Sequence, residues 1–189
     1  MFDVSQEPFL IVGLGNPGPN YERTRHNAGV MALHELLSHA RPMPASLSAH
    51  KKSNTLIAET RLGDAKVVMA QLRCYMNLSG APVRQLADFF KIPPTKVIVL
   101  FDDLELDFGK IKIATTGGDH GHNGLRSITK SLGAKDYVRA SIGIGRPPGR
   151  MDVSSFVLKP FSKSEAQELP IICADMADEV ERFVTTFER

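Results

Sequence analysis

The spacing of hydrophobic residues switches between two periods along the chain. Short apolar runs and strict alternation, which are typical of β-strands, cover residues 9–12, 55–60, 65–71, 96–101, 110–114 and 138–144. Apolar positions three and four residues apart, which are typical of amphipathic helices, cover residues 28–39, 79–90, 123–132 and 163–187. Because alternating strands and helices pack in layers, this pattern predicts an α/β fold in which helices flank a twisted, mixed β-sheet.

Some element boundaries carry signals of their own. Residues 62–64, Leu-Gly-Asp, predict a hairpin turn between two strands. Ser79 is a candidate N-cap for the helix that follows it. Ser162 and Glu165 have the spacing of a capping box, whereas Pro170 can split the last helix.

The composition is that of a folded protein. With 189 residues, 42% of them hydrophobic and 23% charged, the chain predicts one globular domain and excludes disorder as the main state. Cys74 and Cys173 form neither a disulfide framework nor a metal-binding pair, which suits a reducing compartment. No apolar run is long enough to span a bilayer, and the N-terminus lacks the basic region of a signal peptide. We therefore expect a cytoplasmic protein with no membrane contact.

The formal net charge of +2 hides an uneven distribution. Residues 110–160 hold nine basic and three acidic side chains, whereas residues 161–189 hold three basic and seven acidic ones. A basic block of this kind can engage phosphate groups. A solvated face that the acidic tail balances in space is the alternative.

Residues 13–18, Gly-Leu-Gly-Asn-Pro-Gly, match the G-x-G-x-x-G pattern of dinucleotide sites. That pattern requires a helix to begin at once, and Pro17 and Pro19 disfavour such a start. The segment instead predicts a rigid turn, with the Asn16 amide at its tip as a candidate donor. A nucleotide cofactor is therefore not expected.

Polar residues gather where predicted strands end. His26 lies just before a helix, and Asp102 and Asp103 end a buried strand. The carboxyl ends of strands form the usual site edge of an α/β sheet, and a carboxylate that reaches a histidine fixes its tautomer. Since consecutive strand residues point to opposite faces, only one of the two aspartates should face this edge. The alternatives are a structural histidine and solvated or capping carboxylates.

A third polar segment, residues 117–124, contains His120, His122 and Asn123 among four glycines. Zinc is one interpretation of two nearby histidines, although no second ligand cluster accompanies them. The glycines favour close approach of backbone to a ligand at the helix N-terminus instead. Asn123 can also be a simple N-cap, and Asn77, which precedes another helix, can be a cap or turn residue. A Gly-x-Ser-x-Gly nucleophile motif does not occur.

Taken together, five ordered motifs resemble those of the bacterial-type peptidyl-tRNA hydrolases. They are VGLGNPGPNYERTRHN (12–27), YMNLSG (75–80), DDLEL (102–106), GHNGLRS (121–127) and RASIGIGRP (139–147). The resemblance extends over residues 9–187. It implies a single domain over 1–189, with an extension at 1–8, a lid loop at 147–160 and a C-terminal helical segment at 163–187.

The resemblance also implies an activity, namely hydrolysis of the ester between a peptide and the 3′ ribose of tRNA. It makes His26 the general base for water, Asp102 the residue that orients it, and Asn16 the residue that holds the peptide carbonyl or the water. The implied substrate-binding residues are Tyr21, Met76, Asn77 and Asn123. An ester needs only a base and a few amide donors, so neither a metal nor another cofactor is expected.

The expected partner is peptidyl-tRNA, bound by a monomer. The resemblance gives Arg139 a contact with a tRNA phosphate. A second basic position of the family falls on Ala114, and Lys112, two residues earlier on the same strand face, is the expected substitute. A non-catalytic RNA-binding protein of the same fold is the alternative function, and a nucleotide-dependent oxidoreductase is a more distant one.

Overall fold

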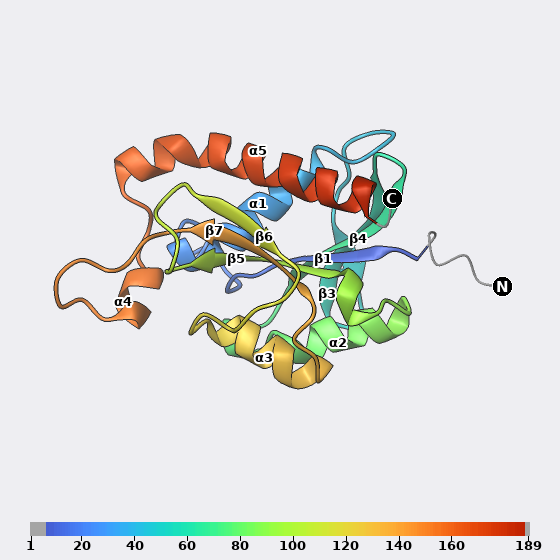
Figure 1. Cartoon of the computed structure of the whole chain (residues 1–189), viewed down its shortest axis with the longest axis horizontal. Helices are drawn as coiled ribbons and strands as arrows, with labels where there is room; N and C mark the ends of the chain where they lie inside the picture. Colours follow the sequence, from blue (N-terminus) through green and yellow to red (C-terminus); the bar gives the residue numbers. More distant parts are fainter. Residues whose placement is uncertain (1–6, 188–189) are drawn as a thin grey trace.

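A seven-stranded mixed sheet forms the middle layer of the protein (Figure 1). The computed structural model describes residues 7–187, so most of the expected extension over residues 1–8 lies outside the described residues. The strands run in the order β2-β3-β4-β1-β5-β7-β6. Their bounds are β1 Phe9–Gly13, β2 Ser48–His50, β3 Thr55–Leu62, β4 Ala65–Leu72, β5 Val97–Asp103, β6 Ile111–Ala114 and β7 Val138–Gly143.

The four central strands β4, β1, β5 and β7 are parallel to one another, and the outer strands pair antiparallel. Strand β5 is buried along its whole length. Its side chains alternate between two apolar clusters: Ile98 and Leu100 belong to one, and Val97, Val99 and Phe101 to the other. This central strand, covered on both sides, explains why its sequence is a continuous apolar run rather than an alternating one.

Helices cover both faces of the sheet (Figure 1). Helices α1 (Ala28–Leu37) and α5 (Lys163–Thr186) lie on one face, and α2 (Gly80–Phe89) and α3 (Asn123–Leu132) lie on the other. The short helix α4 (Val153–Val157) lies at one end of the sheet. The predicted α/β fold with a mixed sheet and flanking helices is therefore confirmed. Within residues 7–187, no helix combines the length and apolar character needed to cross a membrane.

Three local details refine the predicted boundaries. Ser79 does not cap α2 through its side chain, because it continues the short 3₁₀ turn Met76–Leu78 and its hydroxyl donates to the Met76 carbonyl at 2.6 Å. The capping box of Ser162 and Glu165 is present. Helix α5 runs on through Pro170 without a break.

Close packing of α1 on the sheet depends on a glycine. A Cβ atom at Gly29 would lie 2.2 Å from the Leu100 carbonyl oxygen and 2.8 Å from the Leu14 amide nitrogen. The same two groups form a hydrogen bond of 3.0 Å that joins the end of β1 to β5. Because any side chain here would separate α1 from the sheet, Gly29 sets the distance between the start of α1 and the end of β5.

We therefore expect the substitution Gly29→Ala to lower the free energy of unfolding by about 2–3 kcal/mol, as overpacking of a tight contact usually does. Gly118→Ala is the matched control, since nothing lies within 4 Å of a Cβ atom at that position. Denaturant titration of both variants measures the effect. Equal midpoints for the two variants would contradict this account of helix packing.

Candidate active site

A cavity of about 460 Å³ opens at the carboxyl ends of the parallel strands. It brings together the three polar segments of the sequence, from the turn after β1, the end of β5 and the start of α3. The lining residues are Asn16, His26, Tyr75, Met76, Asn77, Asp102, Leu104, His120, Gly121, His122, Asn123, Val153, Ser154, Val157 and Leu158. Polar groups at the base and apolar groups along the wall make this a concave site of the kind that binds a substrate.

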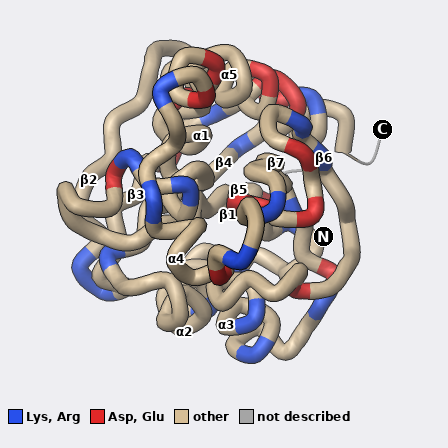
Figure 2. Tube along the Cα trace, turned by 90° about the vertical axis from the view of Figure 1, so that its left-hand side faces the viewer, with Lys and Arg blue, Asp and Glu red and all other residues tan. Residues whose placement is uncertain are grey.

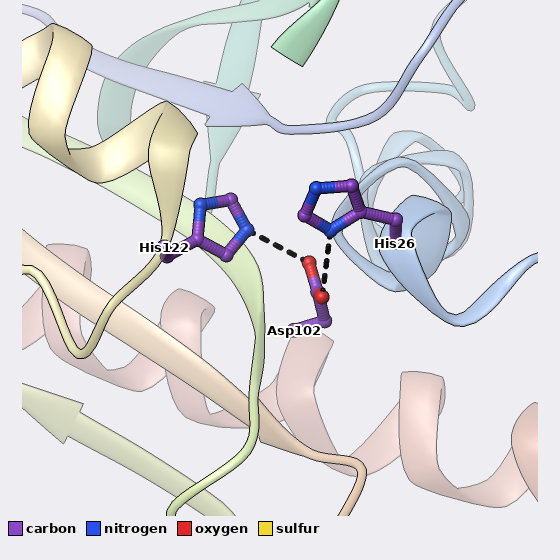
Figure 3. Close-up of side chains that lie close together, drawn as sticks. All are labelled: His26, Asp102 and His122. Atoms are coloured by element: carbon purple, nitrogen blue, oxygen red, sulfur yellow. Dashed lines mark hydrogen bonds and ion pairs between the residues drawn. The ribbon is translucent and has the colours of Figure 1, made fainter. Parts of the chain in front are cut away.

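The base of the cavity is built around the Asp102 carboxylate, which lies between two imidazoles (Figure 3). His26 Nδ1 lies 2.8 Å from Asp102 Oδ2, and His122 Nε2 lies 2.9 Å from Asp102 Oδ1. Asp102 is only 3% exposed. Burial raises the pKa of this carboxyl group, but the charges and hydrogen bonds of His122 and His26 outweigh burial and hold the pKa well below its ordinary value. Asp102 is therefore ionised at physiological pH.

The hydrogen bonds of His122 fix its tautomer. Its Nδ1 atom accepts from the backbone amides of Gly124 and Leu125, at 3.0 and 3.4 Å, and thereby caps α3. A ring nitrogen that accepts carries no proton, so the proton of the neutral ring lies on Nε2, which donates to Asp102. His122, and not Asn123, is thus the N-cap of this helix, and the cap leaves the Asn123 side chain exposed at the cavity.

The same logic assigns the proton of His26. Asp102 Oδ2 accepts a hydrogen bond from His26 Nδ1, so in the neutral ring the Nε2 atom keeps its lone pair. Among the described residues, no hydrogen bond involves His26 Nε2, and the ring lines the cavity. A histidine oriented by a buried carboxylate, with its second nitrogen free in a cavity, can accept a proton from a bound molecule.

Asn16 is held rigidly at the tip of its turn. Its backbone amide donates to Asn27 Oδ1 at 2.9 Å, and Asn27 Nδ2 donates to the Asn16 carbonyl at 3.0 Å. The Asn16 side chain accepts from the Met76 amide through Oδ1 at 2.8 Å, which leaves its NH₂ group for the cavity. Because this segment forms a turn braced by side chains rather than a helix N-terminus, it lacks the geometry of a dinucleotide fingerprint.

Of the four residues expected to bind substrate, three line the cavity and one does not. Asn77 and Asn123 are exposed and line the cavity, and Met76 lines it from a buried position. Tyr21 does not line it, but packs edge-on against Tyr75, with 6.3 Å between the ring centres. Tyr75 itself is 55% exposed and lines the cavity. The sequence offers one signal for the role of Tyr75 in the cavity, namely its position two residues before Asn77.

Asp103 faces away from the base of the cavity, as the alternation of strand side chains predicts. Its carboxylate contacts His120 at 3.0 Å and the Glu105 amide at 2.9 Å. Of the two aspartates, only Asp102 therefore contacts the two histidines at the base of the site.

Two sets of side chains near the cavity have donor atoms close enough to hold a metal ion: His26, Asp102 and His122, and separately Asp103, Glu105 and His120. In the first set, Asp102 shares hydrogen bonds with both rings, and the other nitrogen of His122 is committed to the backbone. His120 and His122 do not form the joint zinc site considered from the sequence, because His120 contacts Asp103 whereas His122 contacts Asp102.

Arg139, the residue expected to contact a tRNA phosphate, is buried in this structure. Its side chain is 1% exposed and donates to the carbonyls of Gly118, Lys135 and Tyr137 at 2.8, 2.8 and 2.9 Å. The guanidinium also stacks on the Tyr137 ring at 4.0 Å. In this structure the glycine-rich loop over residues 115–121 covers Arg139, so a phosphate can reach it only if that loop moves.

Other basic side chains are exposed near the site. Lys112 lies exposed on β6, opposite Ser141 of β7, and Ala114 pairs with Arg139. Arg126 and Lys130 are exposed on α3. Figure 2 shows the acidic residues of α5 on the far side of the sheet from α3. The acidic residues of α5 therefore do not neutralise the basic residues of α3.

Comparison with known proteins agrees with this architecture. The family model for peptidyl-tRNA hydrolase matches residues 10–189. A peptidyl-tRNA hydrolase of Corynebacterium diphtheriae is 63% identical over 179 residues, which cover 95% of this chain and 97% of that protein. One of Mycobacterium avium is 51% identical, with 94% and 92% covered. A crystal structure of peptidyl-tRNA hydrolase from Acinetobacter baumannii superposes with a TM-score of 0.83 at 31% identity, covering 95% and 88% of the two chains.

Fold and site thus define an α/β enzyme whose cavity is built around a histidine–carboxylate pair. The matches extend over nearly the whole chain and agree with one another. The chain belongs to the peptidyl-tRNA hydrolase family.

The burial of Arg139 leads to a prediction about stability. Arg139→Ala removes a buried side chain and the three hydrogen bonds that it donates to backbone carbonyls, so we expect the free energy of unfolding to fall by about 3 kcal/mol. Lys112→Ala, on the exposed face of the neighbouring strand, should change it by less than about 0.5 kcal/mol. Denaturant titration compares the two. An unchanged stability of the Arg139 variant would restore a mainly RNA-contacting role for this residue.

Proposed function

We propose that the chain hydrolyses peptidyl-tRNA at the ester between the peptide and the 3′ ribose, with His26 as the general base. The observation that carries this proposal is the free Nε2 atom of His26, which faces the cavity while Asp102 holds Nδ1. Membership of the family supplies the substrate class.

In the proposed reaction, His26 Nε2 takes a proton from water as the oxygen of that water attacks the ester carbonyl carbon. Asp102 stabilises the imidazolium that forms. The tetrahedral intermediate then collapses, the bond to the ribose 3′ oxygen breaks, and the imidazolium returns the proton to that oxygen. The products are a peptide with a free carboxylic acid, which releases its proton to solvent, and a tRNA with a free 3′ hydroxyl, so atoms and charges balance.

Amide groups around His26 suit the parts of the substrate that do not vary. The NH₂ group of Asn16 can donate to the carbonyl oxygen, where negative charge develops in the transition state. Asn77 and Asn123 each offer a donor and an acceptor, which fits peptide groups irrespective of side chain. Tyr75, Leu104 and Leu158 form an apolar wall for the side chains of the peptide.

The RNA is proposed to leave the cavity between α2 and α3. Asn77 and Asn123 line the cavity and also a second hollow of about 790 Å³, which Arg126 and Lys130 line further out. A single strand that enters past the two asparagines thus meets two exposed cations, as the phosphates of a tRNA 3′ end require. Lys112 lies outside this path and stays a candidate for contact with a tRNA phosphate.

The segment over residues 147–160 is proposed to act as a lid. Val153, Ser154, Val157 and Leu158 of α4 and its C-terminal end form one wall of the cavity. The end of the segment is anchored near the base, because Arg25 donates its backbone amide to Lys159 and its guanidinium to the Phe156 carbonyl. A wall that is fixed at one end and carries a short helix is suited to close over a bound peptide.

The reaction itself provides the first test. The purified protein should hydrolyse an N-acetylated aminoacyl-tRNA in the presence of EDTA, and His26→Ala should lose about 10²–10⁴-fold in kcat, the usual contribution of a general base. Binding of uncharged tRNA should be unchanged in this variant.

Three results would contradict the proposal in different ways. Hydrolysis abolished by EDTA and restored by a metal would assign His26, Asp102 and His122 to a metal site. Full activity of the His26 variant would exclude His26 as the base. Tight tRNA binding with no hydrolysis by the unmodified protein would favour the non-catalytic RNA-binding alternative.

The RNA path is tested by salt dependence. Replacing Arg126 or Lys130 with alanine should weaken tRNA binding and reduce the slope of log affinity against log salt by about one for each phosphate that is no longer neutralised. Lys66→Ala is the control, since Lys66 is exposed on β4 and lies outside both cavities. Slopes equal to that of the control would exclude this path.

A further inference from the structure

A second group of ligating side chains lies at the rim of the cavity and has no part in the proposed hydrolysis. It consists of Asp103 at the end of β5, Glu105 just after it, and His120 in the glycine-rich loop over residues 115–121. His120 Nδ1 lies 3.0 Å from Asp103 Oδ2 and 3.6 Å from Glu105 Oε2. One donor atom from each of the three side chains fits within a span of 4.8 Å.

We propose that Asp103, Glu105 and His120 bind one divalent transition-metal ion of the zinc class. Zinc takes carboxylate oxygens and imidazole nitrogens at about 2.0–2.2 Å, so ligand atoms in a tetrahedral site lie about 3.4 Å apart. The two separations from His120 Nδ1, 3.0 and 3.6 Å, lie on either side of that value. Water completes the set in the fourth position, since Glu105 is exposed to solvent.

The charge at Asp103 is an independent reason to expect a cation. Asp103 is 2% exposed, and a buried carboxylate needs a compensating positive charge. Among the described residues, no lysine or arginine forms an ion pair with Asp103, and His120 is its one partner that can carry a positive charge. A divalent ion would balance Asp103 and Glu105 together, whereas a protonated imidazole balances only one of them.

The other two metal-capable groups of the described residues are weaker candidates. The group of His39, Asp178 and Glu181 joins the segment just after α1 to α5, but the Asp178 side chain is 63% exposed and so needs no added cation. The group around Asp102 already has two imidazoles for its buried carboxylate. Only Asp103 combines burial, a single imidazole partner and a second carboxylate within reach.

An ion at this site would act on the loop that carries His120. His120 has a backbone φ of 53°, in the left-handed region that residues other than glycine rarely adopt, and this conformation brings its ring to Asp103. The Gly118 carbonyl of the same loop covers Arg139. A bound ion would therefore hold the loop in its closed position beside the cavity. It does not touch His26 Nε2, so the site is separate from the hydrolytic step and its test does not depend on that step.

Calorimetric titration of the full chain, freed of metal by EDTA and then dialysed without chelator, tests the proposal with ZnCl₂ as the probe. We expect saturable binding of one ion at this site, with proton release where His120 is protonated beforehand. His120→Asn should weaken the binding by at least about tenfold, since loss even of an outer partner of a metal site has that effect. His39→Asn is the matched control and should bind as the unmodified protein does.

Glu105→Gln gives a second variant that is safe for folding, because Glu105 is exposed, and it should also weaken binding. The melting temperature should rise with zinc in the unmodified protein and in the His39 variant, and much less in the other two. No saturable binding by the unmodified protein would overturn the proposal. So would unchanged binding in both the His120 and Glu105 variants, or loss of binding in the His39 variant alone.

Discussion

The arrangement of the candidate site depends on one buried carboxylate. Asp102 lies at the end of a buried strand and accepts one hydrogen bond at each oxygen, from His26 and from His122. Since His122 is tied to the start of α3 through its other nitrogen, the backbone sets the position of its proton, and the ionised carboxylate sets that of His26. The free lone pair on His26 Nε2 is the result of that order.

The fold brings these groups together through the parallel centre of its sheet. Strands β1 and β5 end side by side, so the turn after the first and the aspartates of the second lie at one edge. The glycine contact between α1 and the Leu100 carbonyl then brings the start of that helix, with His26 just before it, close to Asp102. The position of His26, the proposed base, thus follows from helix packing as much as from the residues of the cavity.

The sequence allowed most of this arrangement to be predicted, because strand ends and polar residues coincide. Asp102 at a strand end, His26 before a helix and Asn16 at the tip of a turn were candidates by position, and the alternation along β5 correctly predicted that only one of the two aspartates faces the cavity. The capping role of His122 was missed, because Asn123 is the more common cap residue and the imidazole can cap only when its other nitrogen has a partner. The burial of Arg139 was missed as well, since a charged residue in an alternating strand gives no sign that a distant loop covers it. Both features depend on contacts between distant segments, which a local sequence pattern does not reveal.

The central claim is that Asp102 and the helix backbone fix the protons of both imidazoles. Long-range ¹H–¹⁵N correlation of the histidine rings at neutral pH measures this directly, with His26→Asn and His122→Asn used to assign the signals. We predict that the singly protonated form of His122 carries its proton on Nε2 and that of His26 carries its proton on Nδ1. A proton on Nδ1 of His122, or a singly protonated His26 with its proton on Nε2, would contradict the account.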